Sequence, residues 1–412
     1  LSNPKACFGS CPTFYAPDAS GEMALLAEGY SSSIAPSMRA RDVDALGLRA
    51  SGGSFELRMT NEALETHVTR RADLLAVPVA SGETAYFEVH GTDEGRFWRT
   101  TDERAPRACS APEGDCTSAL AEADGSERTS EASATDLGEK ESIVLTFDAP
   151  EAESLALVLT ARQSLLTTFL VYQGLAYAGE DIGGWIAMGE TRARSGDAIP
   201  RGRGDTMLGR VTDIPVEVRG ADGEWVEAGM VHEVGPLARD AHLVRLPEVG
   251  PGPVEVRLRP TMGAWRLDAA RLVSVVGEAT PVRLSPEAVL RESPDAETAP
   301  DAAALALLTD DAEDLVTLPG TALRLQYRLP DAPVASEWAL FLEAEGYYLE
   351  WMRDEWMPER DPDALAEMLF SPEDALRRLA PMYKDMEAGM EEAFWGSRFA
   401  APAAPLTTAP SP

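Results

Sequence analysis

The chain has 412 residues, with 69 Asp and Glu against 36 Lys and Arg, so its formal net charge is −33. This length supports two or three domains, and the hydrophobic residues, 44% of the sequence, are enough to build their cores, which excludes a wholly disordered chain. The negative charge repels phosphate backbones, and no Lys/Arg-rich stripe interrupts it, so nucleic acid is excluded as a partner.

Residues 1–98 are predicted to form a small β domain. A polar turn between two apolar runs indicates a hairpin at its start, and 54–60 alternates apolar and polar side chains as a half-buried strand does. One short helix is expected at 40–48. Strands are expected at 14–15, 23–30, 54–60, 74–79 and 84–89.

The next segment, 99–141, is predicted to be a long acidic loop, because 102–141 holds eleven acids against four bases and 99–146 contains no aromatic residue. Residues 142–276 are predicted to form a jelly-roll-like β-sandwich, since short strands recur about every ten residues with turn residues between them. The helical spacing of apolar residues in 165–189 predicts one inserted helix, with a break at Gly183-Gly184.

The final third changes character. Residues 277–330, rich in Pro, Glu and Ala and without an aromatic before Tyr327, are predicted to be a linker with a short strand. Residues 331–400 are predicted to be an acidic, aromatic-rich helical module, and 401–412 a disordered Pro/Ala tail. The first helix of the 331–400 module is expected from Ser336 to Pro358. Two more helices are expected to begin at Asp361-Pro362 and Ser371-Pro372, where a capping residue precedes Pro. The fold class is therefore mainly β with α: an antiparallel sandwich body with one inserted helix and a C-terminal helical module.

Four cysteines fall in two close pairs, Cys7/Cys11 and Cys109/Cys116. This spacing favours two local disulfides, while a zinc site built from all four thiolates and free thiols remain as alternatives. Disulfides indicate an oxidising compartment, so the protein is predicted to be exported to the periplasm or beyond. No apolar run reaches the length of a membrane helix, and a lipid-bearing cysteine upstream of Leu1 would be one route to membrane attachment.

The chain offers little conventional catalytic machinery. It contains no G-x-S-x-G sequence, and its four histidines, His67, His90, His232 and His242, share no metal-binding spacing. The acids of 310–314 are a weak candidate for Ca²⁺, but they lack the pattern of a calcium loop, and solvated acids are the favoured interpretation. We therefore expect no cofactor and no catalytic residue.

The most distinctive remaining feature is a group of six aromatic residues between 338 and 356. On a helix, Tyr347 and Trp351 would lie off the stripe of Trp338, Tyr348 and Trp356, so a second apolar face would be open to a partner. Trp395 near the end of the chain would extend this face. The interaction candidates are thus Tyr347, Trp351, Trp356 and Trp395.

Two groups of motifs carry a family resemblance. Cys11-Pro12-x-x-Tyr15 leads to Ala27-Glu28-Gly29-Tyr30, and then to Thr60-Asn61-Glu62-x-x-Glu65-Thr66. This arrangement resembles uncharacterised exported bacterial proteins with a Ser-Cys-Pro-x-x-Tyr opening and a Thr-Asn-Glu-x-x-Glu-Thr segment. The later group is Val256-Arg257-Leu258-Arg259…Gly263-x-Trp265-x-Leu267-Asp268, which resembles the closing strands of the same proteins. The resemblance covers residues 1 to about 275 and implies an envelope location and a β-rich body, with no activity or catalytic residue to carry over. For Asn61 we expect a turn or side-chain-to-backbone role rather than catalysis.

The leading hypothesis is a non-enzymatic, exported bacterial envelope protein that binds protein partners or serves as an accessory subunit of a larger complex. The negative charge beside the C-terminal aromatics favours a basic or cation-bridged protein surface as the partner. The alternative is a carbohydrate-binding module or glycosidase on the jelly-roll-like part, at Trp225 or Trp265.

Overall fold

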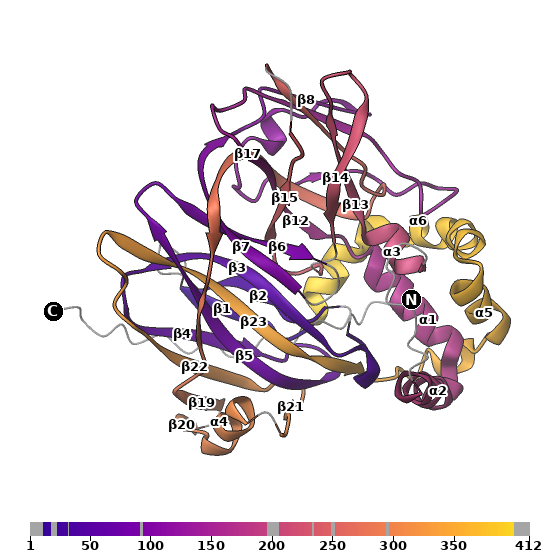
Figure 1. The fold of residues 1–412 in the computed structure, drawn as a ribbon. Coiled ribbons are helices and arrows are strands. Elements are labelled where there is room, and N and C mark those ends of the chain that lie inside the picture. The colour runs from indigo at the N-terminus through magenta and orange to yellow at the C-terminus, as the bar shows by residue number, and fades with distance from the viewer. Residues whose placement is uncertain are drawn as a thin grey trace.

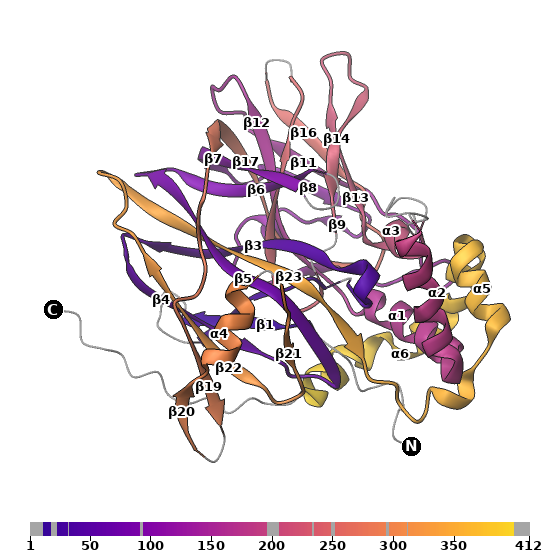
Figure 2. The same cartoon turned by 60° about the horizontal axis from the view of Figure 1, so that its bottom comes forward.

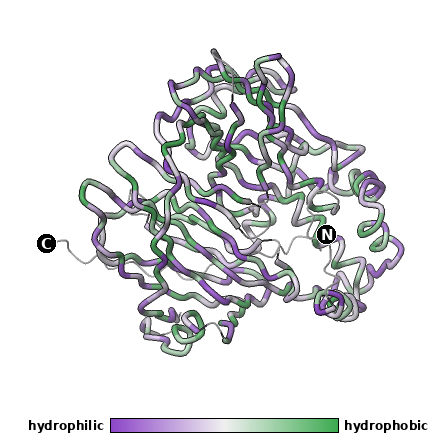
Figure 3. Tube along the Cα trace, viewed as in Figure 1, coloured by the Kyte–Doolittle hydropathy of each residue, from purple (hydrophilic) through white to green (hydrophobic). Residues whose placement is uncertain are grey.

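The computed structural model describes residues 11–17, 23–31, 33–90, 94–195, 206–232, 235–248, 252–293, 296–310 and 312–398. Two β-sandwiches pack against each other, and a group of helices covers one side of the molecule in both views (Figures 1 and 2). Hydrophobic stretches run through the strands, whereas loops and outer helices are more hydrophilic (Figure 3). The predicted class, mainly β with antiparallel sheets and C-terminal helices, is confirmed.

The first sandwich is built from both ends of the chain. Its sheet A has the order β2-β1-β4-β22-β19-β20, and its sheet B has the order β18-β5-β23-β3, with β21 also paired to β5. Sheet A consists of β1 (Thr13–Pro17), β2 (Met23–Glu28), β4 (Gly53–Thr60), β19 (Ala288–Ser293), β20 (Ala296–Pro300) and β22 (Ala322–Leu329). Sheet B consists of β3 (Ala40–Ala50), β5 (Glu65–Ala80), β18 (Val282–Leu284), β21 (Leu315–Thr317) and β23 (Ser336–Glu350).

The second sandwich is inserted between β5 and β18. Its sheet C contains β6 (Thr84–His90), β7 (Glu94–Arg104), β10 (Arg128–Thr129), β12 (Leu155–Gln163), β15 (Asp240–Arg245) and β17 (Trp265–Ala279). Its sheet D contains β8 (Ala108–Ala111), β9 (Gly114–Asp115), β11 (Ile143–Phe147), β13 (Ile214–Arg219), β14 (Trp225–Val231) and β16 (Val254–Leu258). Because β17 also pairs with β7, sheet C closes into a small barrel around an apolar cluster. The five strands of this barrel are β17, β12, β15, β6 and β7.

The predicted helix at 336–357 is wrong, because this segment is mostly strand β23. Its neighbours explain the misleading pattern. Trp338, Leu340 and Leu342 belong to the core between sheets A and B, while Ala339 and Phe341 pack on the opposite face against β6 and β7. A strand buried on both faces reads as a continuous apolar run, which also satisfies helical spacing. The helical part of 331–400 therefore begins only after this strand.

Three other sequence-based predictions need correction. The segment 40–48, expected as a helix, lies in strand β3, which pairs with β23. The expected linker 277–330 instead contributes five complete strands and helix α4 (Ala302–Thr309) to the first sandwich. The expected loop 99–141 carries the end of β7, the β8–β9 hairpin and β10. All three supply partners to strands that lie far away in sequence, so local composition alone did not reveal them.

Helices α1 (Leu166–Ala178) and α2 (Ile182–Arg194) occupy the predicted helical region, but the break falls at Gly179 and not at Gly183-Gly184. Gly179 has φ +51°, and a Cβ there would lie 2.8 Å from the Cβ of Arg360. The short helix α3 (Met207–Thr212) follows. The two predicted C-terminal helices are confirmed as α5 (Pro362–Phe370) and α6 (Pro372–Ser397), and the Asp361 side chain caps α5 by accepting the Ala364 N–H.

The predicted Cys109–Cys116 disulfide is formed and lies in the core of the second sandwich. Cys11 is buried, but its expected partner Cys7 lies outside the described residues, as does the predicted tail 401–412. Within the part of the chain that the structure describes, no helix is both long enough and apolar enough to cross a membrane.

Candidate functional site

The two motif segments meet at the connection between β4 and β5, residues 61–64. Asn61 shapes this connection: its side-chain amide donates to the carbonyl oxygens of Glu65, at 3.0 Å, and Thr317, at 3.3 Å. Its Oδ1 accepts the N–H of Ala63 at 3.4 Å. Asn61 is buried, so its amide satisfies backbone groups that water does not reach.

Glu62 joins three parts of the chain beside this connection. Its carboxylate accepts hydrogen bonds from the hydroxyl of Thr60, at 2.8 Å, and from the phenol of Tyr15, at 3.1 Å. The guanidinium of Arg398, just beyond α6, donates to the same carboxylate at 2.8 Å. Burial, followed by the charge of Glu62, raises the pKa of Tyr15. The end of α6 is thereby held against the first sandwich.

A buried polar cluster lies on the other side of the connection. Glu65 and Glu350 are direct cross-strand partners in β5 and β23, and Nε2 of His67 lies 2.7 Å from Oε1 of Glu65. Tyr172 of α1 donates its hydroxyl to Glu350 at 2.9 Å, and Arg353 pairs with the same carboxyl group at 3.3 Å. Burial, followed by the charge of Glu65, raises the pKa of Glu350 well above its usual range.

These residue types can perform acid–base chemistry, but their surroundings favour a structural role. Glu65 and His67 are fully buried, and the side chains of Glu350 and Arg353 are nearly so. A general acid or base must come within hydrogen-bond reach of a substrate, which this packing prevents. The cluster instead ties helix α1 to the two central strands of sheet B.

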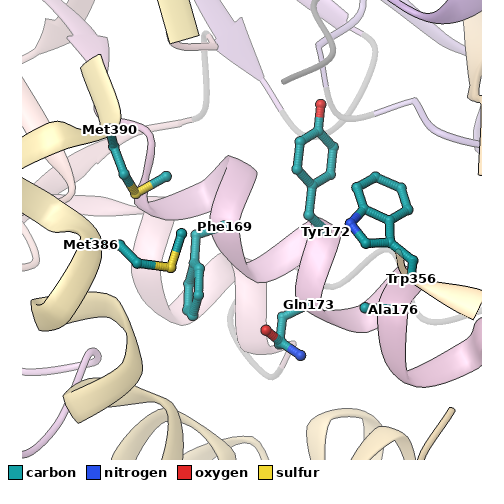
Figure 4. A pocket seen from close by; sticks show the side chains of 7 residues that line it. All are labelled: Phe169, Tyr172, Gln173, Ala176, Trp356, Met386 and Met390. Atoms are coloured by element: carbon teal, nitrogen blue, oxygen red, sulfur yellow. The ribbon is translucent and has the colours of Figure 1, made fainter. Parts of the chain in front are cut away.

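A small pocket adjoins the cluster, between α1 and α6 (Figure 4). Its volume of 10 Å³ is enough for about one water molecule. Aromatic rings and thioethers dominate its walls, with one amide and no carboxylate. The lining residues are Phe169, Tyr172, Gln173, Ala176, Trp356, Met386 and Met390. This lining gives the pocket no pair of acids of the kind a glycosidase needs.

The four interaction candidates have different environments. Trp356 is only 1% exposed, and its ring packs 5.0 Å from that of Tyr172, so it belongs to the core and is withdrawn as a surface candidate. Tyr347 is half-buried beneath the guanidinium of Arg39, 5.3 Å from the ring centre. Trp351 and Trp395 remain 42% and 44% exposed.

Both exposed tryptophans are anchored near the β4–β5 connection. The backbone N–H of Trp351 donates to the carbonyl of Leu64, and its indole N–H donates to Thr66 Oγ1 at 3.0 Å. The indole N–H of Trp395 donates to Glu391 at 3.0 Å, and its ring contacts Arg398, which binds Glu62. We call the exposed side chains of Trp351 and Trp395, which are anchored near the largely buried connection 61–64, the tryptophan surface.

The two tryptophans considered for carbohydrate binding also differ. Trp265 is buried in the core of the second sandwich and cannot stack on a sugar. Trp225 is half-buried, with the guanidinium groups of Arg219 and Arg257 at 5.4 and 4.5 Å from its ring centre. Arg219 forms an ion pair with Glu255 and Arg257 forms one with Glu217, so two ion pairs lie beside the ring.

The described residues include no group of three or more His, Cys, Asp or Glu side chains arranged to hold a metal ion. In the acidic stretch considered for Ca²⁺, Asp314 pairs with Arg39 at 2.6 Å and Arg70 at 2.7 Å. Asp311 lies outside the part of the chain that the structure describes.

Sequence reasoning singled out Asn61 and Glu62 but missed Glu65, His67, Tyr172 and Arg353 as one cluster. A signal was present in β5, where Glu65, His67 and Thr69 alternate with other residues and therefore share a strand face. Their partners come from β23 and α1, which no local pattern connects to β5.

Comparisons with known proteins leave the family open. No protein-family model matches the chain, and no curated protein matches it. Two solved glycoside hydrolase family 86 enzymes show slight structural likeness: BuGH86wt, in complex with neoagarooctaose, and the β-porphyranase BpGH86A from Bacteroides plebeius. Their TM-scores are 0.20 and 0.19, with 6% and 9% identity. The matches cover 59% and 65% of this chain but only 35% and 44% of those enzymes. Likeness at this level supports no conclusion about function.

Proposed function

We propose that this chain is a non-enzymatic, exported bacterial envelope protein that binds a protein partner through the tryptophan surface. The observation that carries the proposal is that Trp351 and Trp395 are exposed although hydrogen bonds from their indole N–H groups hold both side chains in place. Tryptophans held in place before binding lose little conformational entropy, and they are frequent among the residues that dominate interface energies. The Cys109–Cys116 disulfide supports an oxidising, extracytoplasmic location.

The test compares variants of the purified full-length chain as bait for envelope proteins of the producing organism. Three baits are immobilised: the wild type, the double variant Trp351→Ala/Trp395→Ala, and the control Trp225→Ala. We expect one partner to be retained by the wild type and the control, with at least tenfold less on the double variant, because two central tryptophans each contribute about 2 kcal/mol at such sites.

Equal retention by all three baits would overturn the proposed surface, as would a wild-type chain that retains no partner. Circular dichroism and thermal unfolding establish that the double variant is folded. Quantitative mass spectrometry of the eluates measures retention.

A further inference from the structure

We propose that the tryptophan surface accepts a basic segment, rich in Arg or Lys, of its partner protein. This inference rests on the proposed function and adds the chemistry of the bound segment.

The indole N–H groups of Trp351 and Trp395 already donate to Thr66 and Glu391. Any further contact with a partner is therefore made by the exposed parts of their rings, since the two residues are 42% and 44% exposed. The face of an indole attracts cations, and Arg398 lies 5.5 Å from the ring centre of Trp395 in the folded chain. Trp395 thus already binds one guanidinium on its ring, and 44% of the residue remains exposed for a further contact.

The chain segment that carries both tryptophans is predominantly acidic. Residues 351–398 contain twelve acids and six bases. Each of the six bases forms an ion pair within the described structure: Arg353, Arg360, Arg377, Arg378, Lys384 and Arg398. All six bases are therefore paired, and although Arg210 and Arg266 from outside the segment pair with Glu373 and Glu391, other acids of the segment remain without an ion pair in the described structure.

Some of the excess acids flank the two tryptophans in sequence. Asp354 and Glu355 follow Trp351, and Glu392 precedes Trp395 by three positions. None of the three acids forms an ion pair with another residue that the structure describes, and Asp354 and Glu392 are exposed. A basic segment would combine cation–π contact with charge complementarity, which steers association and selects the partner.

The experiment measures binding of two fluorescent octapeptides, (Arg-Ser)4 and (Glu-Ser)4, by fluorescence anisotropy at low and high NaCl. We expect the wild type to bind the Arg peptide and not the Glu peptide, with affinity falling at least tenfold at high salt. The variant Trp351→Ala/Trp395→Ala should bind the Arg peptide at least tenfold more weakly, and Trp225→Ala should bind it normally.

A matched pair of charge variants separates local recognition from general attraction to an acidic protein. Asp354→Asn/Glu355→Gln/Glu392→Gln should weaken binding several-fold and reduce its salt dependence. Glu224→Gln/Glu227→Gln/Glu248→Gln removes equal charge elsewhere and should change affinity little. Equal weakening by both triple variants, or binding that ignores both tryptophans, would overturn the inference.

The two proposals fail in different ways. If a natural partner is retained in a tryptophan-dependent manner but the Arg peptide shows no such dependence, the proposed function stands and the basic-segment inference is wrong. If retention does not depend on the tryptophans, the binding surface itself is wrong.

Discussion

Two buried glutamates of the first sandwich, Glu343 and Glu28, show how differently the same side chain can be accommodated. Glu343 of β23 receives hydrogen bonds from Arg283 and Arg41, each at 2.7 Å from Oε2. Burial alone would raise its pKa, but the hydrogen bonds from the two guanidinium groups outweigh burial and lower it. Glu343 therefore stays ionised in the core.

Glu28, at the end of β2, has no guanidinium among its hydrogen-bond donors in the described structure. Oε1 accepts the backbone N–H groups of Leu237 and Ala238 at 2.6 and 3.0 Å. Burial raises its pKa to about 8, although these two N–H groups and the charge of Arg398 act in the opposite direction. Asp42 adds to the increase, and Asp44, itself buried, interacts with Glu28 and Asp240.

Burial does not by itself decide the charge of a carboxyl group. A cation within hydrogen-bond distance keeps Glu343 ionised, whereas backbone N–H groups alone leave Glu28 protonated over much of the pH range. The two groups consequently give stability opposite pH dependences. Glu343 favours folding above its unfolded pKa, and Glu28 favours folding at low pH.

The largest expected effect comes from closing the space around Glu28. Gly235 has φ +89°, and a Cβ on this residue would lie 2.4 Å from the carboxyl carbon of Glu28. Gly235→Ala should therefore lower the free energy of unfolding by about 3 kcal/mol, combining backbone strain with the clash. Gly223→Ala, at φ +85° in open space, isolates the strain and should cost about 1 kcal/mol. Equal losses in urea unfolding would show that Glu28 can move aside.

Removing a cation from Glu343 should have the next largest effect. Arg283→Met leaves Arg41 as the remaining hydrogen-bonded cation, so we expect a loss of about 2 kcal/mol rather than the full cost of an unpaired buried charge. Arg328→Met, which breaks the exposed pair with Glu287, should cost less than about 1 kcal/mol. Chemical denaturation at pH 7 measures both, and similar losses would contradict the role given to Arg283.

The most specific effect concerns pH. Because the pKa of Glu28 rises from 4.5 to about 8 on folding, its contribution is greatest below pH 4.5 and is lost as the pH rises to about 8. Glu28→Gln removes this titration, so between pH 5 and 9 it should lose less stability than the wild type, and it should be the more stable protein at pH 9. Unfolding curves between pH 5 and 9 measure the slope, and parallel curves for the two proteins would contradict the raised pKa.

Sequence patterns predicted elements whose environment is asymmetric. Strand β4 alternates because only one of its faces is deeply buried, and α5 begins at the capping residue Asp361. They failed for β23, which is buried on both faces and so carries apolar residues at helical spacing. The polar cluster was not predicted for a related reason. Glu65 and Glu350 meet only because strands from opposite ends of the chain pair with each other.

That long-range pairing has a consequence for biosynthesis. In β5 and β23, Glu65 lies opposite Glu350 and Ala80 lies opposite Ser336, while every strand of the second sandwich comes between them in sequence. As the nascent chain lengthens, the inserted sandwich can complete its own sheets first, whereas β5 must wait for β23 with both apolar faces uncovered. The first sandwich is therefore the part of the molecule most dependent on chaperone protection before synthesis and folding are complete.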